Sequence, residues 1–240
     1  MSSDLTVDLA KKDAYLLRLA AYTHGFLAKL APWKGLFQTT GWYVKDSYPQ
    51  PQLHFSDTIW KDEQELTQFH YSKDGTFKEY SVKNEKENGP KEPEPGLTDK
   101  STDVLSATLM VMNEVAATGK CDGTNKIFDG QRSYNLIFHH KLQENLKANE
   151  YNVYSGPATE CTIEVKPLEG KWHAKPRGWM SIQEQGRDRG TMPTIWFAQM
   201  APGEPAVPVK IRVKTEYGTL FMHLTHYSGQ GKTLDLPEED

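Results

Sequence analysis

Eight histidines and two cysteines are the side chains of this sequence best suited to bind a metal ion or to catalyse a reaction. His223 and His226 lie three residues apart in the segment HLTH, within a predicted strand. Side chains three apart on a strand point to opposite faces, so the two imidazoles cannot hold one ion. The adjacent pair His139 and His140 fails for the same reason. We therefore expect no metal site and no cofactor.

Sequence motifs for nucleophilic catalysis and for phosphate binding are missing. The sequence has no GxSxG segment, neither GxGxxG nor GxxxxGK[ST], and no paired carboxylates in a recognisable catalytic context. Neither cysteine has an evident histidine partner for thiol catalysis. These observations predict a protein that is not an enzyme. A hydrolase with an unrecognised site is the least favoured alternative.

The two cysteines, Cys121 and Cys161, have two interpretations that their spacing does not separate. They form a disulfide in an oxidising compartment, or they are two buried thiols in the cytosol. A zinc site is disfavoured because neither cysteine belongs to a CxxC or CxxH pair. A disulfide would close a loop of about 40 residues, which contributes roughly 4 kcal/mol in the chain-entropy model.

Composition narrows the class of protein and of partner. With 37% hydrophobic and 25% charged residues, the 240-residue chain is predicted to be globular, and no apolar stretch is long enough for a membrane-spanning helix. The net charge of −4 argues against nucleic acid or an anionic membrane as partner. The first four residues, MSSD, lack the features of a signal peptide, so the residues alone leave the compartment open.

The first part of the chain has the alternating pattern of antiparallel strands. A hairpin is predicted over Asp4–Tyr22, followed by a segment of one helical turn or a loop from Gly25 to Phe37. Four more strands are expected in TTGWYV, PQLHFSDTIW, ELTQFHY and TFKEYSV, with a hairpin turn at Lys73-Asp74-Gly75. The charged, Pro- and Gly-rich stretch from Asn84 to Gly96 is predicted to be a solvated loop.

One strong helix is predicted between Asp99 and Thr118, and most securely over residues 101–118. Apolar residues recur on one of its faces at helical spacing, at Leu105, Leu109, Met112 and Ala116. Ser101 or Thr102 is expected to cap its start, and Gly119 to end it. Because the segment is apolar on more than one side, we expect the helix to be largely enclosed.

After this helix the sequence returns to strands, with a hairpin turn at Asp129-Gly130. A GKWHAKPRG loop, a TIWFAQM strand and a final pair of strands, PVKIRVKT and TLFMHLTHY joined at Glu216-Tyr217-Gly218, complete the pattern, with Pro208 as the first residue of its strand. We predict a single domain over residues 1–228 and a polar tail over residues 229–240.

Aromatic residues are the remaining feature that bears on binding. Trp33, Phe37, Trp42 and Tyr43 lie close together in the sequence, and Trp196 and Phe197 lie in a late strand. They either form core or line an apolar groove for a lipid-like ligand. In the second case, the candidate ligand-binding residues are Leu105, Leu109, Met112, Trp33, Trp42 and Trp196.

Several segments together resemble a bacterial family catalogued as domain of unknown function 3108. They are TDKSTDVLSATLMVMNEV, CDGTNKIFDGQRSYNLIF, YSGPATECTIEVKPLEG and the stretch from TIWFAQM to HLTHY. The resemblance implies an exported, periplasmic protein in which Cys121 and Cys161 are oxidised to a disulfide. It also implies a mainly β fold, in which a curved antiparallel sheet (a half-barrel or β-spiral) wraps around one central helix. That outline is similar to the envelope's lipoprotein carriers.

The family carries no established catalytic residues, so the resemblance assigns none. It implies a signal peptide and a further strand ahead of Asp4, and hence an unpaired sheet edge along Asp4–Ala10. Our leading hypothesis is a non-enzymatic periplasmic protein that binds an apolar or lipid-like ligand or supports envelope integrity. The alternative is a protein-interaction module that binds an envelope protein through a sheet edge or the 84–96 loop.

Overall fold

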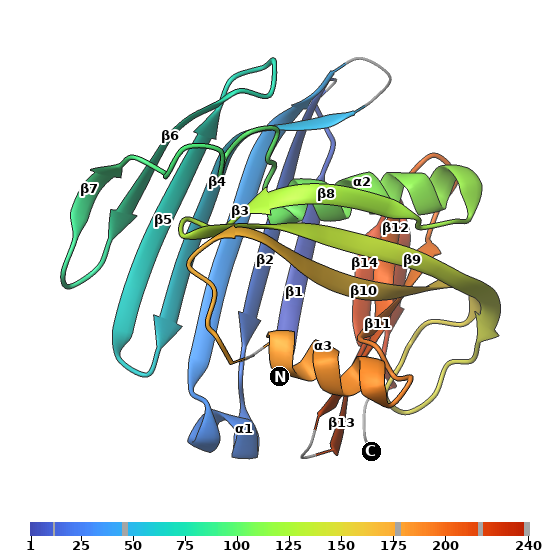
Figure 1. The fold of residues 1–240 in the computed structure, drawn as a ribbon. Coiled ribbons are helices and arrows are strands. Elements are labelled where there is room, and N and C mark those ends of the chain that lie inside the picture. The colour runs from blue at the N-terminus through green and yellow to red at the C-terminus, as the bar shows by residue number, and fades with distance from the viewer. Residues whose placement is uncertain (12, 45–47, 176–178, 216–217, 238–240) are drawn as a thin grey trace. The chain divides into compact units, whose positions relative to one another are not determined.

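The protein is mainly β, as predicted (Figure 1). The computed structural model describes residues 1–11, 13–44, 48–175, 179–215 and 218–237, and these form fifteen strands and three helices. Two compact units divide the chain. The first unit comprises residues 1–110, 125–135 and 167–172, and the second unit comprises residues 111–124, 136–166 and 173–240. The single domain over residues 1–228 stays a prediction.

A seven-stranded sheet belongs to the first unit, and its spatial order is the order of the sequence (Figure 1). Its strands are β1 (Ser2–Asp8), β2 (Ala14–Tyr22), β3 (Trp33–Tyr43), β4 (Pro49–Trp60), β5 (Glu63–Tyr71), β6 (Phe77–Lys83) and β7 (Asn88–Lys91). The predicted hairpin and the four following strands are confirmed as β1 to β6. β1 is an outer strand, which agrees with the expected unpaired edge.

The turn predicted at Lys73-Asp74-Gly75 is also confirmed. The Asp74 carboxylate accepts hydrogen bonds from the Ser72 hydroxyl at 2.6 Å and from the Thr76 N–H at 3.0 Å. Gly75 has φ +88°, which glycine adopts without steric cost. These hydrogen bonds hold the pKa of the exposed Asp74 at about 2.

The stretch from Asn84 to Gly96 is not only the solvated loop that composition predicts. Its residues Asn88–Lys91 form β7, which pairs with β6. The Asn84 side chain accepts the N–H groups of Lys86 and Glu87 and so closes the turn. Composition is a poor guide here because an outer strand needs main-chain hydrogen bonds to one neighbour and little apolar burial. Pro90 is tolerated for the same reason.

The predicted long helix is confirmed as α2 (Val104–Thr118), but its cap is neither Ser101 nor Thr102. Asp103 caps it, since its Oδ1 accepts the N–H groups of Leu105 at 2.9 Å and Ser106 at 3.1 Å. Gly119, at φ +72°, ends the helix as expected, and its N–H donates to the Val115 carbonyl.

Two apolar clusters form the core of the first unit. In one, Leu105 and Leu109 of α2 pack against Tyr15 and Leu17 of β2. In the other, aromatic side chains of the sheet meet Leu97 and Phe128, and the buried members are Phe69, Tyr71, Tyr80, Leu97 and Phe128. Each aliphatic side chain buried in this way stabilises the fold by roughly 1.5–3 kcal/mol. The expectation that α2 is largely enclosed is met in this unit.

A second sheet has six strands in the order β13-β12-β11-β10-β9-β8. Its strands are β8 (Gly123–Phe128), β9 (Arg132–Leu146), β10 (Gly156–Gly170), β11 (Thr194–Gln199), β12 (Ala206–Thr215) and β13 (Gly218–His223). The predicted turn at Asp129-Gly130 joins β8 to β9. Pro208 is the third residue of β12, where the ladder to β11 shifts register, and not the first residue as expected. A single sheet around one helix is therefore not what the strands form.

The disulfide implied by the family resemblance is confirmed. Cys121 and Cys161 are bonded within the second unit, and both are fully buried. The bond ties the segment after α2 to the middle of β10. Thr159, two residues earlier in β10, donates its hydroxyl to the Gly119 carbonyl at 3.1 Å.

Two helices besides α2 are present. α1 (Gly25–Leu30) falls where the sequence allows one helical turn, and α3 (Trp179–Asp188) is missing from our predictions. In α3, the buried Gln183 side chain accepts the Val165 N–H at 2.5 Å and donates to the Val165 carbonyl at 2.8 Å. It thus occupies the position of a strand partner on β10. Part of the expected GKWHAKPRG loop, residues 176–178, lies outside the described residues.

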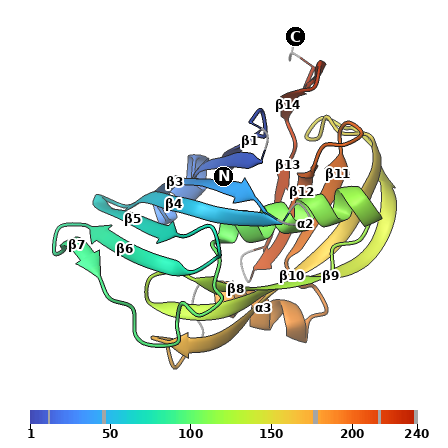
Figure 2. The ribbon, with the colours of Figure 1, turned by 90° about the horizontal axis from the view of Figure 1, so that it is seen from above.

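The end of the chain differs from the expected single strand TLFMHLTHY. β13 ends at His223, and His226 begins β14 (His226–Gly229), which pairs with β15 (Lys232–Asp235) in a separate hairpin near the C-terminus (Figure 2). The two histidines of HLTH therefore lie in different sheets. The expected polar tail, 229–240, contains β15, and the turn residues 216–217 lie outside the described residues. No helix in the described part of the chain is long and apolar enough to cross a membrane.

Candidate functional site

A pocket in the first unit is the candidate binding site, and the strand register explains its floor. Tyr22 of β2 pairs with Lys34 of β3, and Lys34 pairs with Ile59 of β4, so their side chains form one row on one face of the sheet. All three line the pocket, which has a volume of about 330 Å³. This volume is at the lower end of the range of small-molecule sites.

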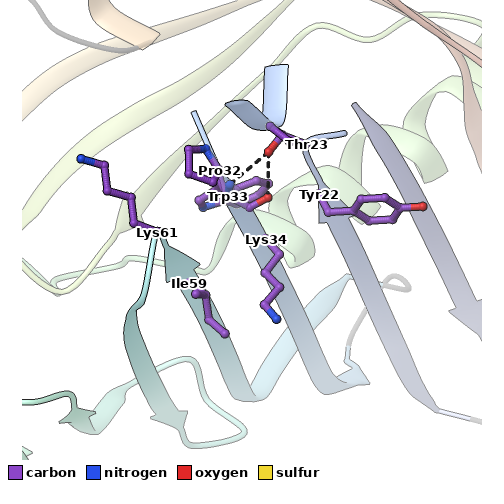
Figure 3. Close-up of a pocket in the computed structure, with 8 residues that line it drawn as sticks. Tyr22, Thr23, Pro32, Trp33, Lys34, Ile59 and Lys61 are labelled. Atoms are coloured by element: carbon purple, nitrogen blue, oxygen red, sulfur yellow. Dashed lines mark hydrogen bonds between the residues drawn. The ribbon is translucent and has the colours of Figure 1, made fainter. Parts of the chain in front are cut away.

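The rest of the pocket is formed where these strands end and α1 begins. Thr23, Ala28, Pro32, Trp33 and Lys61 complete its lining (Figure 3). Thr23 holds the two sides together, because its hydroxyl donates to the Ala31 carbonyl at 2.8 Å and accepts the Trp33 N–H at 3.0 Å. The Lys61 N–H donates to the Pro32 carbonyl at 2.9 Å. Main-chain hydrogen bonds thus fix the wall of the pocket.

The position of Trp33 depends on Gly35. A Cβ atom at residue 35 would lie 2.7 Å from the Trp33 ring and 2.8 Å from the Phe37 ring. Real Cβ contacts are not that short, so any larger residue would push these rings apart. The two rings lie with centroids 6.4 Å apart. Glycine at this position therefore lets the Trp33 ring lie flat along the strand at the pocket wall.

The chemistry of the pocket is apolar with two cations. Tyr22, Pro32, Trp33 and Ile59 supply most of the apolar surface, and Lys34 and Lys61 are exposed. Within the described part of the chain, neither lysine has a carboxylate within 4.0 Å. Their ammonium groups are therefore available to an anionic group of a ligand, such as a carboxylate or phosphate. The arrangement suits a small amphiphile whose charged end reaches a lysine.

The predicted ligand-binding residues are not brought together. Trp33 lines the pocket. Leu105 and Leu109 are buried in the core against β2, and Met112 is buried in the part of α2 that belongs to the second unit. Trp42 is half-buried on β3, and Trp196 is buried in β11, where its indole N–H donates to Glu144. Of the six, only Trp33 contributes to a described pocket.

Sequence reasoning missed the remaining pocket residues because no motif marks them. Tyr22, Lys34 and Ile59 are separated by 12 and 25 residues, and only the register of three strands makes them neighbours. A usable signal was present at Lys61-Asp62, which separates two strand-like segments as a two-residue hairpin turn would. With that turn assigned, pairing outward from it places Ile59 near the sheet end.

A second group of functional side chains, here called the polar cluster, consists of Tyr15, Thr39, His54, Asp103 and Ser106 in the first unit. The carboxylate of Asp103 is at its centre. Asp103 accepts the Thr39 hydroxyl at 2.7 Å and the Ser106 hydroxyl at 2.5 Å. The His54 Nδ1 lies 3.2 Å from Asp103 Oδ1 and 2.8 Å from the Thr39 hydroxyl. The Tyr15 hydroxyl is 2.7 Å from that of Ser106.

These side chains include the residue types of a hydrolase triad, but their hydrogen bonds run in a different direction. Both hydroxyls donate to Asp103, so neither donates to the imidazole, and no base activates a nucleophile. Asp103 is 1% exposed and His54 is 5% exposed, while Thr39 and Ser106 are fully buried. The cluster therefore holds the start of α2 against β2, β3 and β4.

Burial alone would raise the pKa of the Asp103 carboxyl. The neighbouring His54 and the hydroxyl donors Ser106 and Thr39 outweigh that effect, so the pKa of Asp103 lies below its usual value. Burial and the nearby Asp103 charge raise the pKa of Tyr15 far above its usual value, so this phenol stays neutral. Asp103 is thus a buried, fully hydrogen-bonded anion.

Comparison with known proteins gives one result. Residues 1–225 match the family described as "Protein of unknown function (DUF3108)", the family whose resemblance the motifs indicate. No curated protein and no solved structure matches the chain. The outline similarity to envelope lipoprotein carriers thus remains an analogy.

Proposed function

The chain belongs to the family of domain of unknown function 3108, and from that premise we propose that it is a non-enzymatic periplasmic protein that binds an apolar, lipid-like ligand. The observation that carries the proposal is the pocket with its apolar wall and two unpaired lysines. A carboxylate-bearing acyl chain fits this chemistry, since its chain contacts Trp33 and Ile59 and its carboxylate meets Lys34 or Lys61. A role in envelope integrity would follow from carrying or sensing such a molecule.

A buried disulfide supports the periplasmic location, because such bonds persist in oxidising compartments and are rare in the cytosol. The polar cluster supports a function without catalysis, because its carboxylate, imidazole and hydroxyls are buried and already satisfied by one another. Both observations concern this chain alone and do not depend on the family.

Titration of the full chain with a fluorescent fatty acid tests the proposal. We expect saturable binding with one site per chain. The variant Ile59→Glu places a carboxylate on the pocket floor and should weaken binding by about tenfold or more, which corresponds to about 1.4 kcal/mol. The double variant Lys34→Ala/Lys61→Ala should weaken binding of the acid and leave binding of the matching uncharged alcohol unchanged.

The matched controls are Gln64→Glu, an exposed substitution one strand away on the same face, and Lys100→Ala, an exposed lysine outside the pocket. Both should bind as the wild type does. Absence of saturable binding in the wild type would contradict the proposal, as would equal binding by Ile59→Glu and the wild type.

The alternative function, binding of an envelope protein through a sheet edge or the 84–96 loop, also has a specific observation in its favour. Both sheets have free outer strands, and one of them, β13, is exposed and uncharged along its length. β7 gives the 84–96 loop a second outer edge. Crosslinking in cells, with and without the loop, would show a partner band that depends on these elements.

A further inference from the structure

The outer strand β13 lacks the features that usually protect sheet edges. Charged side chains and proline keep outer strands from pairing with other molecules. The other outer strands of the two larger sheets have them: Asp4 and Asp8 in β1, Pro90 and Lys91 in β7, and Lys126 in β8. β13 has the sequence GTLFMH, with no proline and no Asp, Glu, Lys or Arg.

The side chains of β13 are apolar and in contact with solvent. Leu220 is 43% exposed and Phe221 is 50% exposed. Its one titratable side chain, His223, is half-buried, and burial together with the nearby Lys210 lowers its pKa. The strand is therefore uncharged at neutral pH. An exposed, uncharged outer strand of this kind pairs readily with another strand.

We propose that β13 pairs antiparallel with β13 of a second copy of this chain. A two-fold axis perpendicular to the sheet keeps each side chain on its own face, so the register must be centred on a residue. Centring it on Phe221 places Phe221 opposite the partner's Phe221 and Leu220 opposite the partner's Met222. Thr219 then faces the partner's His223. Each pair is aromatic, apolar or uncharged, and such cross-strand pairs stabilise a sheet.

Charge favours this occupant over an acidic peptide. The cations next to β13 lie on β12, where Lys210, Arg212 and Lys214 face His223, Phe221 and Thr219. An added strand touches only the uncharged side chains of β13, so an acidic strand would meet no cation directly. In the pair of copies, the two β12 strands are three strand spacings apart, about 14 Å. This exceeds the Debye length of about 8 Å, so repulsion between them is screened.

The pairing is isologous, because the same strand is used by both copies, and it closes at two chains. It gives the sheet-edge alternative of the proposed function its partner, and it rests on that alternative. It does not depend on the ligand pocket, which is formed by β2, β3, β4 and α1. Loss of the dimer and loss of ligand binding can therefore be told apart.

Sedimentation velocity of the full chain over a range of concentrations tests the inference. We expect a concentration-dependent equilibrium between monomer and dimer. Phe221→Glu should raise the dissociation constant of the dimer by about tenfold or more, because two carboxylates then face each other across the two-fold axis. The variant should still fold, since Arg212 lies directly opposite residue 221 and the Lys210 ammonium is 5.9 Å from its ring.

Charge exchange separates a lost interface from a damaged fold. Phe221→Glu and Phe221→Lys should each be monomeric alone and should form a heterodimer when mixed. Leu142→Glu, a charge placed on another apolar side chain that is 46% exposed, should leave the dimer unchanged. Fluorescent fatty-acid binding should be the same in all these variants.

In the wild type, amide hydrogen exchange at residues 219–222 should slow as the protein concentration rises. A wild type that stays monomeric at every concentration would overturn the inference. So would a dimer that Phe221→Glu leaves intact, or exchange at residues 219–222 that does not change with concentration.

Discussion

At the scale of the residue, Asp103 shows what the sequence conceals. The sequence places a helix near residue 101 and offers Ser101 or Thr102 as its cap, since both are favoured cap residues. Asp103 is chosen instead because Thr39 and His54, more than 48 residues earlier in the chain, reach its carboxylate. No local pattern reports a cap whose partners come from two distant strands.

Substitution of Asp103 tests the role of the polar cluster. We expect Asp103→Ala to lower the free energy of unfolding by about 3–5 kcal/mol, because it leaves buried donors unpaired and removes the helix cap. Urea unfolding followed by circular dichroism measures this change. The control Asp99→Ala removes an exposed carboxylate four residues earlier and should change stability little.

The same carboxylate gives a pH dependence with a definite sign. Because the pKa of Asp103 is lower in the folded chain, its stabilisation is fully present above the pKa of the unfolded chain, about 4. It is lost as pH falls through the lower folded value. The difference in stability between wild type and Asp103→Ala should therefore shrink in strong acid. A difference that stays constant down to pH 2 would contradict a buried anion.

At the scale of the element, the strands were predictable and the helix α3 was not. Alternation of apolar and polar residues marks β1 to β6 because each has one buried face. α3 has the sequence WMSIQEQGRD, polar and interrupted by Gly186, so its periodicity is weak. It is held to β10 by the Gln183 amide, and such a polar contact leaves no hydrophobic pattern in the sequence.

Replacement of Gln183 measures how strongly α3 is held. Gln183→Leu keeps the volume of the side chain and removes both hydrogen bonds to Val165. We expect a loss of about 2 kcal/mol or more of stability and faster amide exchange at Val165. The neighbouring exposed residue gives the control, Glu184→Leu, which should leave the Val165 amide protected. Unchanged exchange in Gln183→Leu would mean that other contacts hold the helix.

At the scale of the whole molecule, the fold class followed from the sequence, whereas the number of sheets did not. Strand periodicity states that a segment is extended, and it does not state which neighbour it joins. The continuous segment TLFMHLTHY is divided between two sheets at Leu224-Thr225. The pocket was missed for the same reason, since its floor is defined by register alone.

The disulfide is the covalent constraint that acts on the whole molecule. Cys121 and Cys161 are 40 residues apart. The double variant Cys121→Ala/Cys161→Ala should lose about 4 kcal/mol of stability in the chain-entropy model. The wild type in reducing buffer should show a similar loss, measured by urea unfolding, and the double variant should not respond to the reductant. Equal stability of the oxidised and reduced wild type would contradict this role.

The central claim is that the pocket beside α1 holds a lipid-like ligand in the periplasm. Native mass spectrometry of the chain purified gently from the periplasm tests it most directly. The account predicts a wild-type species carrying one small amphiphile, whose abundance falls in Ile59→Glu and persists in Gln64→Glu. The bare mass alone in repeated wild-type preparations, or an adduct that is equally abundant in Ile59→Glu, would contradict it.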